Sequence, residues 1–290
     1  MKILIFGAGG MIGHKMFQLL KGRGHEVYGT LFRKPSDYEK FKLFAVNEII
    51  DRIDVAETEK VLALLDEVKP DVVLNCVGIT LRKPEIKNFD YAWKINSDFP
   101  QKLNAWVTKN KAYLVHFSTD CVFSGKDGPY TEDSPKSATD TYGKTKAAGE
   151  VTGPNALTLR GSMIGRELFG KTELLEWALS QKNGQVKGFS KAIYSGVTTN
   201  AMAELVHKLL MLPIKLTGIY QVSSKPISKL DLLKLINQAY HLNLEIVEDE
   251  TFATSKILSS EKLHKAIGFN CPEWPKMVDE LVKDFFKNNG

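Results

Sequence analysis

Short apolar runs alternate with longer amphipathic stretches along the first half of the chain. The short runs are rich in β-branched residues and show little polar alternation, which is typical of strands buried on both faces. We expect such strands at Lys2–Phe6, Glu26–Thr30, Asp71–Cys76, Tyr113–Ser118 and Asn155–Arg160. The stretches between them have apolar residues at helical spacing and predict helices at Met11–Leu20, Ala56–Val68, Asn88–Lys109 and Tyr142–Glu150. Repeated βαβ units of this kind predict an α/β fold with a doubly wound parallel sheet.

The pattern changes after Arg160 and predicts a smaller, mixed α/β region at the C-terminal end. Its expected elements are helices at Glu173–Gln181, Asn200–Met211 and Lys229–Tyr240, a strand at Gly218–Ser223 and a final helix at Pro275–Phe286. Ser228 precedes the third of these helices and has the side chain of a helix N-cap. We therefore expect two domains, a nucleotide-binding domain at residues 1–160 and a smaller substrate-binding region at residues 161–290 that is interleaved with it.

The composition is that of a globular protein, with 43% hydrophobic residues and no uninterrupted apolar run of membrane-spanning length. The apolar run at the start is too short for a secretion signal, so we expect a cytoplasmic protein with no membrane partner. The three cysteines, Cys76, Cys121 and Cys271, are odd in number and widely spaced. That spacing predicts reduced thiols, with neither a disulfide framework nor a metal site.

The formal net charge of +5 comes from 39 basic and 34 acidic residues that are interspersed along the chain. A nucleic-acid partner would favour clustered basic residues, so we expect none. Two interpretations fit the charge equally well: a mildly basic solvated surface, and a basic pocket for an anionic cofactor or substrate.

The first expected strand runs directly into Gly7, Gly10 and Gly13, with Met11 and Ile12 between the last two. In a dinucleotide-binding loop the first glycine permits the turn, the second lets the backbone approach the pyrophosphate, and the third lets the helix pack closely. The free N–H groups at the helix start then face the phosphates. A purely structural turn also uses glycines, but the strand before and the helix after favour a Rossmann-type NAD(P) site.

Two more segments belong to the expected cofactor site. The second strand is followed by Arg33 and Lys34 and by no carboxylate, which favours NADP, with NAD as the alternative. Asp54 follows a short apolar run, where a carboxylate reaches the adenine amino group or, alternatively, caps the next helix. The residues Cys76, Val77 and Gly78 follow a strand at the carboxyl edge of the sheet, where ligands of such sheets bind.

Candidate catalytic groups follow the fifth strand and begin the next helix. Tyr142 and Lys146 are four residues apart and share one helix face. An ammonium group beside a phenol favours the phenolate, which makes the phenol a usable general acid. The hydroxyl of Thr119 can polarise the same carbonyl oxygen. A Tyr-x-x-x-Lys pair is common by chance, and its order after a nucleotide loop and a hydroxyl-bearing strand end is what gives it weight.

Three segments together resemble one branch of the extended short-chain dehydrogenases/reductases, the sugar-nucleotide branch of dTDP-4-dehydrorhamnose reductase-like proteins. The segments are Phe117–Gly125 (FSTDCVFSG), Pro129–Asp133 (PYTED) and Tyr142–Glu150 (YGKTKAAGE). The resemblance implies NADP(H)-dependent reduction of a C4 ketone on a nucleotide-linked 6-deoxyhexose for surface polysaccharides such as O-antigen. It covers the first half of the chain more closely than the rest.

The resemblance also implies roles for individual residues. Thr119, Tyr142 and Lys146 take the catalytic places, and Lys146 also binds the ribose of the nicotinamide. Asp54 and Val55 lie on the adenine side. Relatives of this kind form homodimers in some cases, and the sequence leaves the oligomeric state open. The implied phosphate loop consists of Gly7, Gly10, Met11 and Ile12.

Departures from the family pattern fall on the substrate side. Cys121 stands where the family usually has Tyr, Arg160–Ile164 replaces an Arg-Thr-Ser-Trp segment, and Ala192–Thr199 only resembles the family's strand. From the resemblance we therefore expect the substrate to be dTDP-4-dehydrorhamnose or a UDP-linked N-acetyl analogue. For Trp177 the amphipathic pattern favours a place in a helix core, with the sugar site as the alternative. The expected substrate-binding residues are Cys121, Val122, Phe123, Ser162, Trp177 and Tyr194.

Other activities are weighed against this one. A regulatory subunit is the first alternative, because the regulatory subunit of eukaryotic methionine adenosyltransferase resembles the same branch, although an intact catalytic set favours an enzyme. Epimerisation of a nucleotide sugar stays open, whereas dehydration is disfavoured because Asp120 is followed by Cys121 and not by Glu. His14 and His116 fit packing as well as phosphate binding. No Cys/His cluster indicates a metal, and no base is placed to activate a cysteine.

Overall fold

The computed structural model describes residues 1–288, and its chain forms two compact units. The first unit consists of Met1–Val122, Ala138–Leu159 and Ala203–Ile219. The second consists of Phe123–Ser137, Arg160–Met202 and the chain from Tyr220 onward. Each unit is thus built from three separate stretches of the sequence. The boundary expected between residues 160 and 161 stays a prediction.

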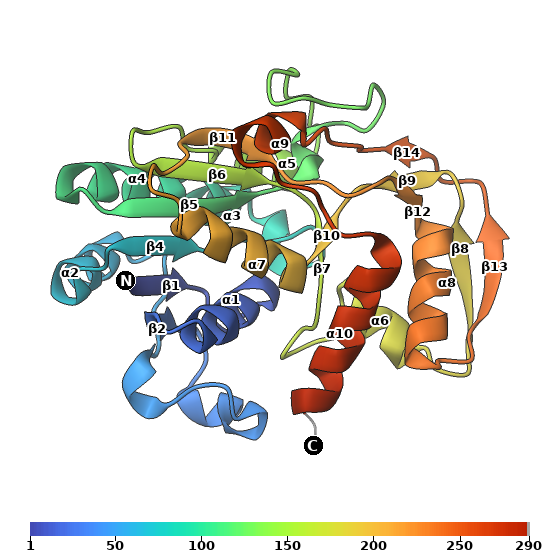
Figure 1. The fold of residues 1–290 in the computed structure, drawn as a ribbon, viewed down its shortest axis with the longest axis horizontal. Helices are drawn as coiled ribbons and strands as arrows, with labels where there is room; N and C mark the ends of the chain where they lie inside the picture. The colour runs from blue at the N-terminus through green and yellow to red at the C-terminus, as the bar shows by residue number, and fades with distance from the viewer. Residues whose placement is uncertain (289–290) are drawn as a thin grey trace. The chain divides into compact units, whose positions relative to one another are not determined.

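A seven-stranded sheet with helices on its faces confirms the expected Rossmann-type fold (Figure 1). Its strand order is β11-β6-β5-β4-β1-β2-β3, and the pairs β3–β2, β2–β1, β1–β4 and β4–β5 are parallel. The strands are β1 (Lys2–Phe6), β2 (Glu26–Thr30), β3 (Ile49–Ile50), β4 (Val72–Asn75), β5 (Tyr113–Ser118), β6 (Ala156–Arg160) and β11 (Gly218–Gln221). Phe6 pairs with Asn75, and Asn75 pairs with His116, so β1 and β4 end at the same level and β5 continues two residues further, to Ser118.

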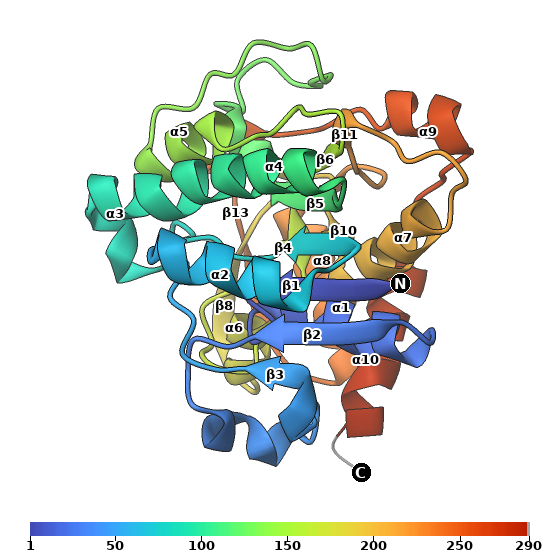
Figure 2. The same ribbon diagram turned by 90° about the vertical axis from the view of Figure 1, so that its left-hand side faces the viewer.

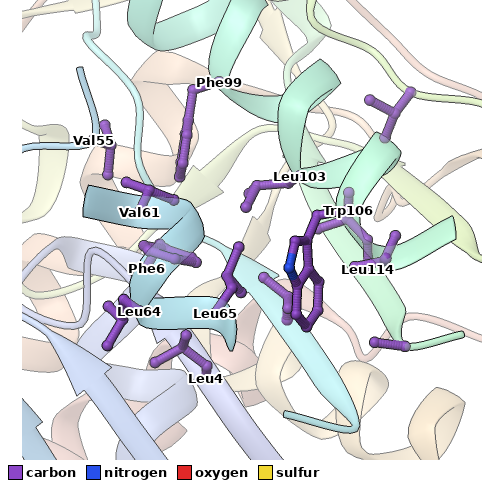
Figure 3. Close-up of a cluster of buried hydrophobic side chains, with 14 of the residues drawn as sticks. Leu4, Phe6, Val55, Val61, Leu64, Leu65, Phe99, Leu103, Trp106 and Leu114 are labelled. Carbon is purple, nitrogen blue, oxygen red and sulfur yellow. The ribbon is translucent and has the colours of Figure 1, made fainter. Parts of the chain in front are cut away.

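The helices of the first unit pack on this sheet through apolar side chains. Helix α1 (Met11–Gly22) packs on β1 and β2, and α2 (Thr58–Val68) packs against α4 (Phe99–Asn110). Side chains of α2, α4 and the sheet strands form a buried cluster (Figure 3). Within it the rings of Phe6 and Phe99 meet edge to face, with their centroids 5.3 Å apart. The cluster includes Leu4, Phe6, Leu64, Leu65, Phe99, Leu103 and Trp106. Continuous apolar strands are needed here because helices cover the sheet.

The helix expected at Asn88–Lys109 is interrupted, which corrects the prediction of one uniform helix. It consists of α3 (Phe89–Trp93), a π-helical turn at Lys94–Asp98, and α4, and Figure 2 shows these as one long path beside α2. Pro100 has no N–H to donate to the carbonyl of Asn96, four residues earlier. The π-helical turn, which is wider than an α-helical turn, occurs where this backbone hydrogen bond cannot form.

The second unit contains small sheets that the sequence pattern did not predict. Strand β8 (Gln185–Phe189) pairs in parallel with β13 (Glu245–Asp249), and α8 packs on both. Strand β9 (Ala192–Tyr194) pairs with β12 (Ile227–Ser228) and β14 (Thr254–Ser255). Strands β8 and β13 contain exposed polar residues, and the strands of the other sheet are only two or three residues long, so both sheets lack the signal of a buried strand.

Helix α8 (Lys229–Tyr240) matches its prediction to the residue, because the Ser228 side chain caps it by accepting from the Asp231 N–H at 2.9 Å. The ends of the other expected helices differ from their predictions by at most two residues. The remaining elements are α5 (Thr141–Ala148), β7 (Met163–Ile164), α6 (Leu174–Ser180), β10 (Val197–Thr198), α7 (Thr199–Leu210), α9 (Glu261–Ile267) and α10 (Trp274–Asn288).

Replacing Leu65 by alanine tests the core under α2. Leu65 is fully buried, so Leu65→Ala is expected to lower the free energy of unfolding by about 2–5 kcal/mol. Leu81→Ala is the matched control, because Leu81 is 49% exposed and its truncation is expected to cost less than about 1 kcal/mol. Urea unfolding followed by circular dichroism measures both, and equal losses for the two variants would contradict the assignment of the core.

Candidate active site

The glycine loop joins β1 to α1 as the sequence predicted. Gly7 has a positive φ of 79°, and the Gly10 N–H donates to its carbonyl at 2.9 Å. A Cβ atom on Gly13 would collide with the same carbonyl, so the helix can approach the loop only because Gly13 has no side chain. Helix α1 begins at Met11 with no side-chain cap, and its first N–H groups, including that of Ile12, form the expected phosphate-binding end.

The structure places the two expected adenosine segments after β2 and after β3. Arg33 and Lys34 are exposed and lie three and four residues beyond the end of β2 at Thr30. The Asp54 carboxylate accepts from the Ala56 N–H at 2.9 Å. Helix α2 begins only at Thr58, so Asp54 stabilises a turn before the helix and is not its N-cap, which corrects that alternative. Val55, the neighbour of Asp54, is buried.

The segment after β4 is held by side chains that the sequence analysis missed. The Asn75 amide oxygen accepts from the Val77 N–H at 3.1 Å. The Asn96 amide accepts from the Ile79 N–H at 2.9 Å and donates to the Ile79 carbonyl at 3.0 Å. Asn96 also donates to the Thr145 hydroxyl at 3.0 Å, which ties this segment to α5. Pro100, four residues after Asn96, was the available sequence signal that the helix is interrupted near Asn96.

Cys76 and Gly78 lie in the same segment, close to α5. A Cβ atom on Gly78 would be 4.0 Å from Lys146 Nζ. Burial raises the pKa of the Cys76 thiol, while the nearby Lys146 charge opposes that rise. The cysteine is therefore held as a thiol, which agrees with the expectation that it is no nucleophile.

Thr119 follows β5 and is buried among polar groups. Its hydroxyl donates to the Asp120 carboxylate at 3.1 Å and accepts from the Cys121 N–H at 3.1 Å. A Cβ atom on Gly143 would collide with the Cys121 carbonyl, so the first turn of α5 lies directly against this strand end. That turn carries Tyr142. The structure thus brings the backbone segments that carry Thr119 and Tyr142 into contact.

Helix α5 carries Tyr142 and Lys146 as predicted. The Asp140 side chain caps it by accepting from the Gly143 N–H at 2.9 Å. Tyr142 is half-buried, whereas Lys146 is only 4% exposed. The Lys146 ammonium donates to the Phe117 carbonyl at 2.7 Å, which links the helix to the last residues of β5.

The electrostatics of Lys146 follow from its burial. Removal from water lowers the pKa of Lys146 to about 8, and the charge of Glu150 opposes that shift. Glu150 also accepts from the Ser118 hydroxyl at 2.6 Å. The hydrogen bond between Ser118 and Glu150 thus joins the end of β5 to the chain just beyond α5, in addition to the bond between Lys146 and Phe117.

His116 lies beneath this site and is fully buried in β5. Its Nδ1 faces the Asn75 amide nitrogen at 3.1 Å. Because the Asn75 oxygen is used by Val77, that amide nitrogen donates and the imidazole accepts. Burial and the Lys146 charge hold the pKa of His116 well below its usual value. His116 is a neutral packing residue, and His14 likewise bonds the Gly10 carbonyl within α1.

The predicted substrate-binding residues are divided between the units. Cys121 and Val122 belong to the first unit, where Cys121 is half-buried and Val122 is buried. The other four, Phe123, Ser162, Trp177 and Tyr194, belong to the second unit.

Within the second unit these side chains differ in exposure. Phe123 is buried, with its ring stacked on Tyr130 at 4.1 Å and covered by the Arg160 guanidinium at 5.0 Å. Tyr194 is buried too, with the Lys229 ammonium 3.9 Å from its ring. Ser162 and Trp177 are half-buried, so the interpretation of Trp177 as a full core residue is not supported.

Residues 1–288 contain no cluster of three or more His, Cys, Asp or Glu side chains able to hold a metal ion. Among the helices in that range, none combines the length and the apolar character needed to cross a bilayer.

Residues 1–286 match the model of the family described as "RmlD substrate binding domain". The chain belongs to that family. The spore coat polysaccharide biosynthesis protein SpsK of Bacillus subtilis is 31% identical over 234 residues, which cover 78% of this chain and 74% of SpsK. The resemblance to dTDP-4-dehydrorhamnose reductase-like proteins is thereby confirmed.

Other relatives match over different lengths. The dTDP-4-dehydrorhamnose reductase of Aggregatibacter actinomycetemcomitans is 23% identical over 97% of this chain and 98% of its own. A Haloferax volcanii protein named "Probable low-salt glycan biosynthesis reductase Agl14" is 30% identical over 57% of this chain, and the match spans 54% of its length. The methionine adenosyltransferase 2 subunit beta of Rattus norvegicus is 28% identical over 51% of this chain and 41% of its own.

The fold recurs in a solved structure. The crystal structure of dTDP-4-dehydrorhamnose reductase from Bacillus anthracis in complex with NADP has a TM-score of 0.80 and 20% identity. The match covers 97% of this chain and 98% of that one. This likeness agrees with the Rossmann-type fold described above.

Substitution of two glycines of α1 tests the close approach at the loop. In Gly13→Ala the added methyl group meets the Gly7 carbonyl, so the loop must shift. We expect a loss of about 1–3 kcal/mol in stability and at least about tenfold weaker NADPH binding. In Gly22→Ala the methyl group meets nothing within 4 Å, and stability is expected to stay constant or rise by up to about 1 kcal/mol.

Thermal unfolding and fluorescence titration with NADPH measure both glycine variants. If Gly13→Ala behaved like Gly22→Ala, the packing of the loop against α1 described here would be wrong.

Proposed function

We propose that this protein is an NADPH-dependent reductase of a nucleotide-linked 4-keto-6-deoxy sugar. The observation that carries the proposal is the buried Lys146 ammonium, which is fixed on the Phe117 carbonyl in the helix that also carries Tyr142. Membership of the RmlD substrate-binding domain family and the reductases among its relatives support the class of activity, an NAD(P)H-dependent sugar-nucleotide reductase.

The residues of the first unit fit a dinucleotide. Gly13 lets helix α1 lie directly against the Gly7 carbonyl, and the uncapped start of α1 offers N–H groups to phosphates. Asp54 and Val55 would lie beside the adenine, and Cys76, Val77 and Gly78 beside the rest of the cofactor. When bound, NADPH supplies the hydride that reduces the ketone. Arg33 and Lys34 would bind the 2′-phosphate, since the end of β2 offers cations and no carboxylate.

Tyr142 would deliver the proton in this reaction. Its phenol donates the proton to the oxygen that gains negative charge as the carbonyl is reduced. The Lys146 ammonium stabilises the phenolate that is left, because opposite charges attract strongly in a buried site. Lys146 is held in place for this by the Phe117 carbonyl.

Thr119 would bind the carbonyl oxygen of the substrate. In the structure its hydroxyl proton is directed to the Asp120 carboxylate. To donate to a carbonyl oxygen, the hydroxyl must turn away from Asp120 while it keeps the Cys121 N–H as a donor. Binding of substrate therefore exchanges one hydrogen bond of Thr119 for another.

The finer parts of the proposal concern the substrate and its setting. Either dTDP-4-dehydrorhamnose or a UDP-linked N-acetyl analogue would bind with contributions from Cys121, Val122, Phe123, Ser162, Trp177 and Tyr194. Phe123 and Tyr194 would shape the substrate region from within, since both rings are buried. A role in surface polysaccharide assembly is supported by the names of SpsK and Agl14. Cytoplasmic location and a homodimer stay predictions.

Replacement of the Tyr142 hydroxyl tests the reductase. Tyr142→Phe is expected to lower kcat by at least about 100-fold, because the phenol proton is lost while the ring remains. The Kd for NADPH is expected to change less than about threefold. Loss of NADPH absorbance measures turnover with a panel of dTDP- and UDP-linked 4-keto-6-deoxyhexoses.

The same assay separates the alternatives. Full turnover by Tyr142→Phe would reject the assigned acid. NADPH binding by the wild type without turnover of any sugar would favour a binding subunit, the role suggested by the match to methionine adenosyltransferase 2 subunit beta. Conversion of a sugar without net oxidation of NADPH would indicate an epimerase.

The pH dependence of reduction tests Lys146. Its pKa is lowered to about 8, so the ammonium form is lost as the pH rises above 8, and kcat/KM for reduction is expected to fall there. In Lys146→Arg the charge persists, and the residual activity is expected to keep its value to higher pH. Initial rates between pH 6 and 10 measure this.

The pH dependence of unfolding serves as the control, because the ionisation of Lys146 is expected to raise stability over the pH range in which it lowers activity. Between about pH 8 and pH 10.5, the ordinary pKa of lysine, Lys146 holds a proton in the unfolded chain that it has lost in the folded chain. The contribution of Lys146 to stability therefore rises with pH in this window. An activity loss that followed global unfolding would contradict the assignment.

A further inference from the structure

Thr145 lies in α5 between Tyr142 and Lys146, although the sequence pattern assigns it no role. Its side chain is fully buried, with an exposed fraction of 0%. The Thr145 hydroxyl accepts from the Asn96 side-chain amide at 3.0 Å and donates to the Tyr142 carbonyl at 3.1 Å. One hydroxyl group therefore joins the backbone of Tyr142 to the π-helical turn at Lys94–Asp98.

The π-helical turn holds the backbone of Thr145 as well as its side chain. The Ser97 hydroxyl donates to the Thr145 carbonyl at 2.7 Å, and Ser97 is itself buried. A Cβ atom on Gly149 would collide with the Asn96 carbonyl, so the end of α5 lies directly against the same turn. Helix α5 can therefore move away from the turn only if two buried hydrogen bonds break.

The other end of this connection lies in the segment that follows β4. The Ile79 N–H donates to the Asn96 amide oxygen at 2.9 Å, and the Ile79 carbonyl accepts from the amide nitrogen at 3.0 Å. A Cβ atom on Gly78 would be 3.5 Å from the same amide oxygen. This is the segment proposed above to lie beside the cofactor. A chain of hydrogen bonds thus runs from it through Asn96 and Thr145 to Tyr142.

The direction of each bond in this chain is fixed. The Asn96 amide nitrogen donates one N–H to Ile79 and the other to the Thr145 oxygen. An amide nitrogen accepts nothing in return, so the Thr145 proton is left for the Tyr142 carbonyl. Valine at position 145 would fill the same space but would leave a buried N–H of Asn96 without its acceptor. The bonding pattern therefore requires a hydroxyl group, which packing alone does not.

We propose that Thr145 is a positioning residue for the reduction: its hydroxyl group fixes the backbone of Tyr142 relative to the cofactor segment after β4. The inference rests on the proposed function, because it assigns the means by which the proton donor is set against the cofactor. Reaction rates depend steeply on such distances, and a displacement of about 1 Å can cost roughly 100-fold. A role of Thr145 in packing alone would depend on its volume and not on its hydroxyl group.

Thr145→Val tests the hydroxyl group because the shape of the side chain is kept. For the sugar of the panel that the wild type reduces, we expect kcat to fall roughly tenfold, whereas KM and the Kd of NADPH stay within about twofold. Thr145→Ser restores the hydroxyl group, and its kcat is expected to lie within about threefold of the wild type. Thr145→Ala also lacks the hydroxyl group and replaces Thr145→Val, with the same expected loss, if the valine variant does not fold.

Thr158→Val is the matched control. Thr158 is also fully buried, and its hydroxyl accepts from the Val151 N–H at 3.1 Å and donates to the Val151 carbonyl at 2.9 Å. The substitution removes the same number of hydrogen bonds from the same unit, and neither of them reaches Tyr142. Circular dichroism is expected to show a similar fall in Tm for both valine variants, while kcat of Thr158→Val stays within about twofold of the wild type.

A double-mutant cycle with Tyr142 shows whether Thr145 acts through the proton donor. In the Tyr142→Phe background the phenol proton is already lost, so its exact position no longer limits the rate. Thr145→Val is therefore expected to lower the residual kcat of Tyr142→Phe by less than about twofold. Loss of NADPH absorbance measures turnover of all variants, and fluorescence titration measures the Kd of NADPH.

The contrary results are distinct from one another. Wild-type kcat in Thr145→Val, no recovery in Thr145→Ser, an equal loss in Thr158→Val, or a further tenfold loss in the Tyr142→Phe background would overturn the positioning role and leave the reductase standing. A wild-type protein that reduced no sugar of the panel would reject the proposed function, and this inference with it.

Discussion

The arrangement of the site depends on one buried ion, the Lys146 ammonium. A charge removed from water costs several kcal/mol unless hydrogen bonds compensate it. Here the compensation comes from the Phe117 carbonyl at 2.7 Å and from the charge of Glu150, which is itself bonded to Ser118. Phe117 belongs to the end of β5, and Glu150 lies two residues beyond α5. The ammonium is therefore compensated only when that strand and that helix keep their present positions relative to one another. The position of Tyr142 follows from the same requirement.

The parallel sheet brings the remaining groups to that place. Phe6, Asn75 and His116 are neighbours across three strands, so the segments that follow β1, β4 and β5 leave the sheet at one edge. At Gly13 and Gly143 the absence of a side chain lets a helix lie directly against the backbone of the segment that follows a strand. The chemistry of the site therefore depends as much on absent side chains as on the polar groups that act.

The sequence predicted those parts of the molecule whose signal is local. The strands buried on both faces were found to within a residue at each end, and α8 was placed to the residue by its Ser228 cap. The glycine loop and the Tyr142–Lys146 pair were found through spacing that survives without tertiary information. For Asp54 the sequence offered two roles, adenine binding and the N-cap of the next helix, and the second was wrong. The same carboxylate can cap a turn or a helix, and only the start of α2 at Thr58 distinguishes the two.

What the sequence did not reveal depends on contacts between distant residues. Asn96 bonds Ile79 and Thr145, and Tyr38 lies on Gly9, and neither relation has a spacing that a pattern could express. The pair β8–β13 was missed for a related reason, because its strands are short, partly charged and stabilised by α8. Residues proposed to bind ligand were thus easier to find in the sequence than the residues that hold them in place.

The π-helical turn at Lys94–Asp98 has a consequence for how such a chain can change over time. A turn of this kind contains one residue more than an α-helical turn, so every side chain beyond it is rotated relative to those before it. Point substitutions alter the residues of the turn but keep their number. Only a deletion or an insertion can restore the regular helix, and that change would turn the buried face of α4 away from the sheet. The turn is therefore expected to persist while the sequence around it diverges.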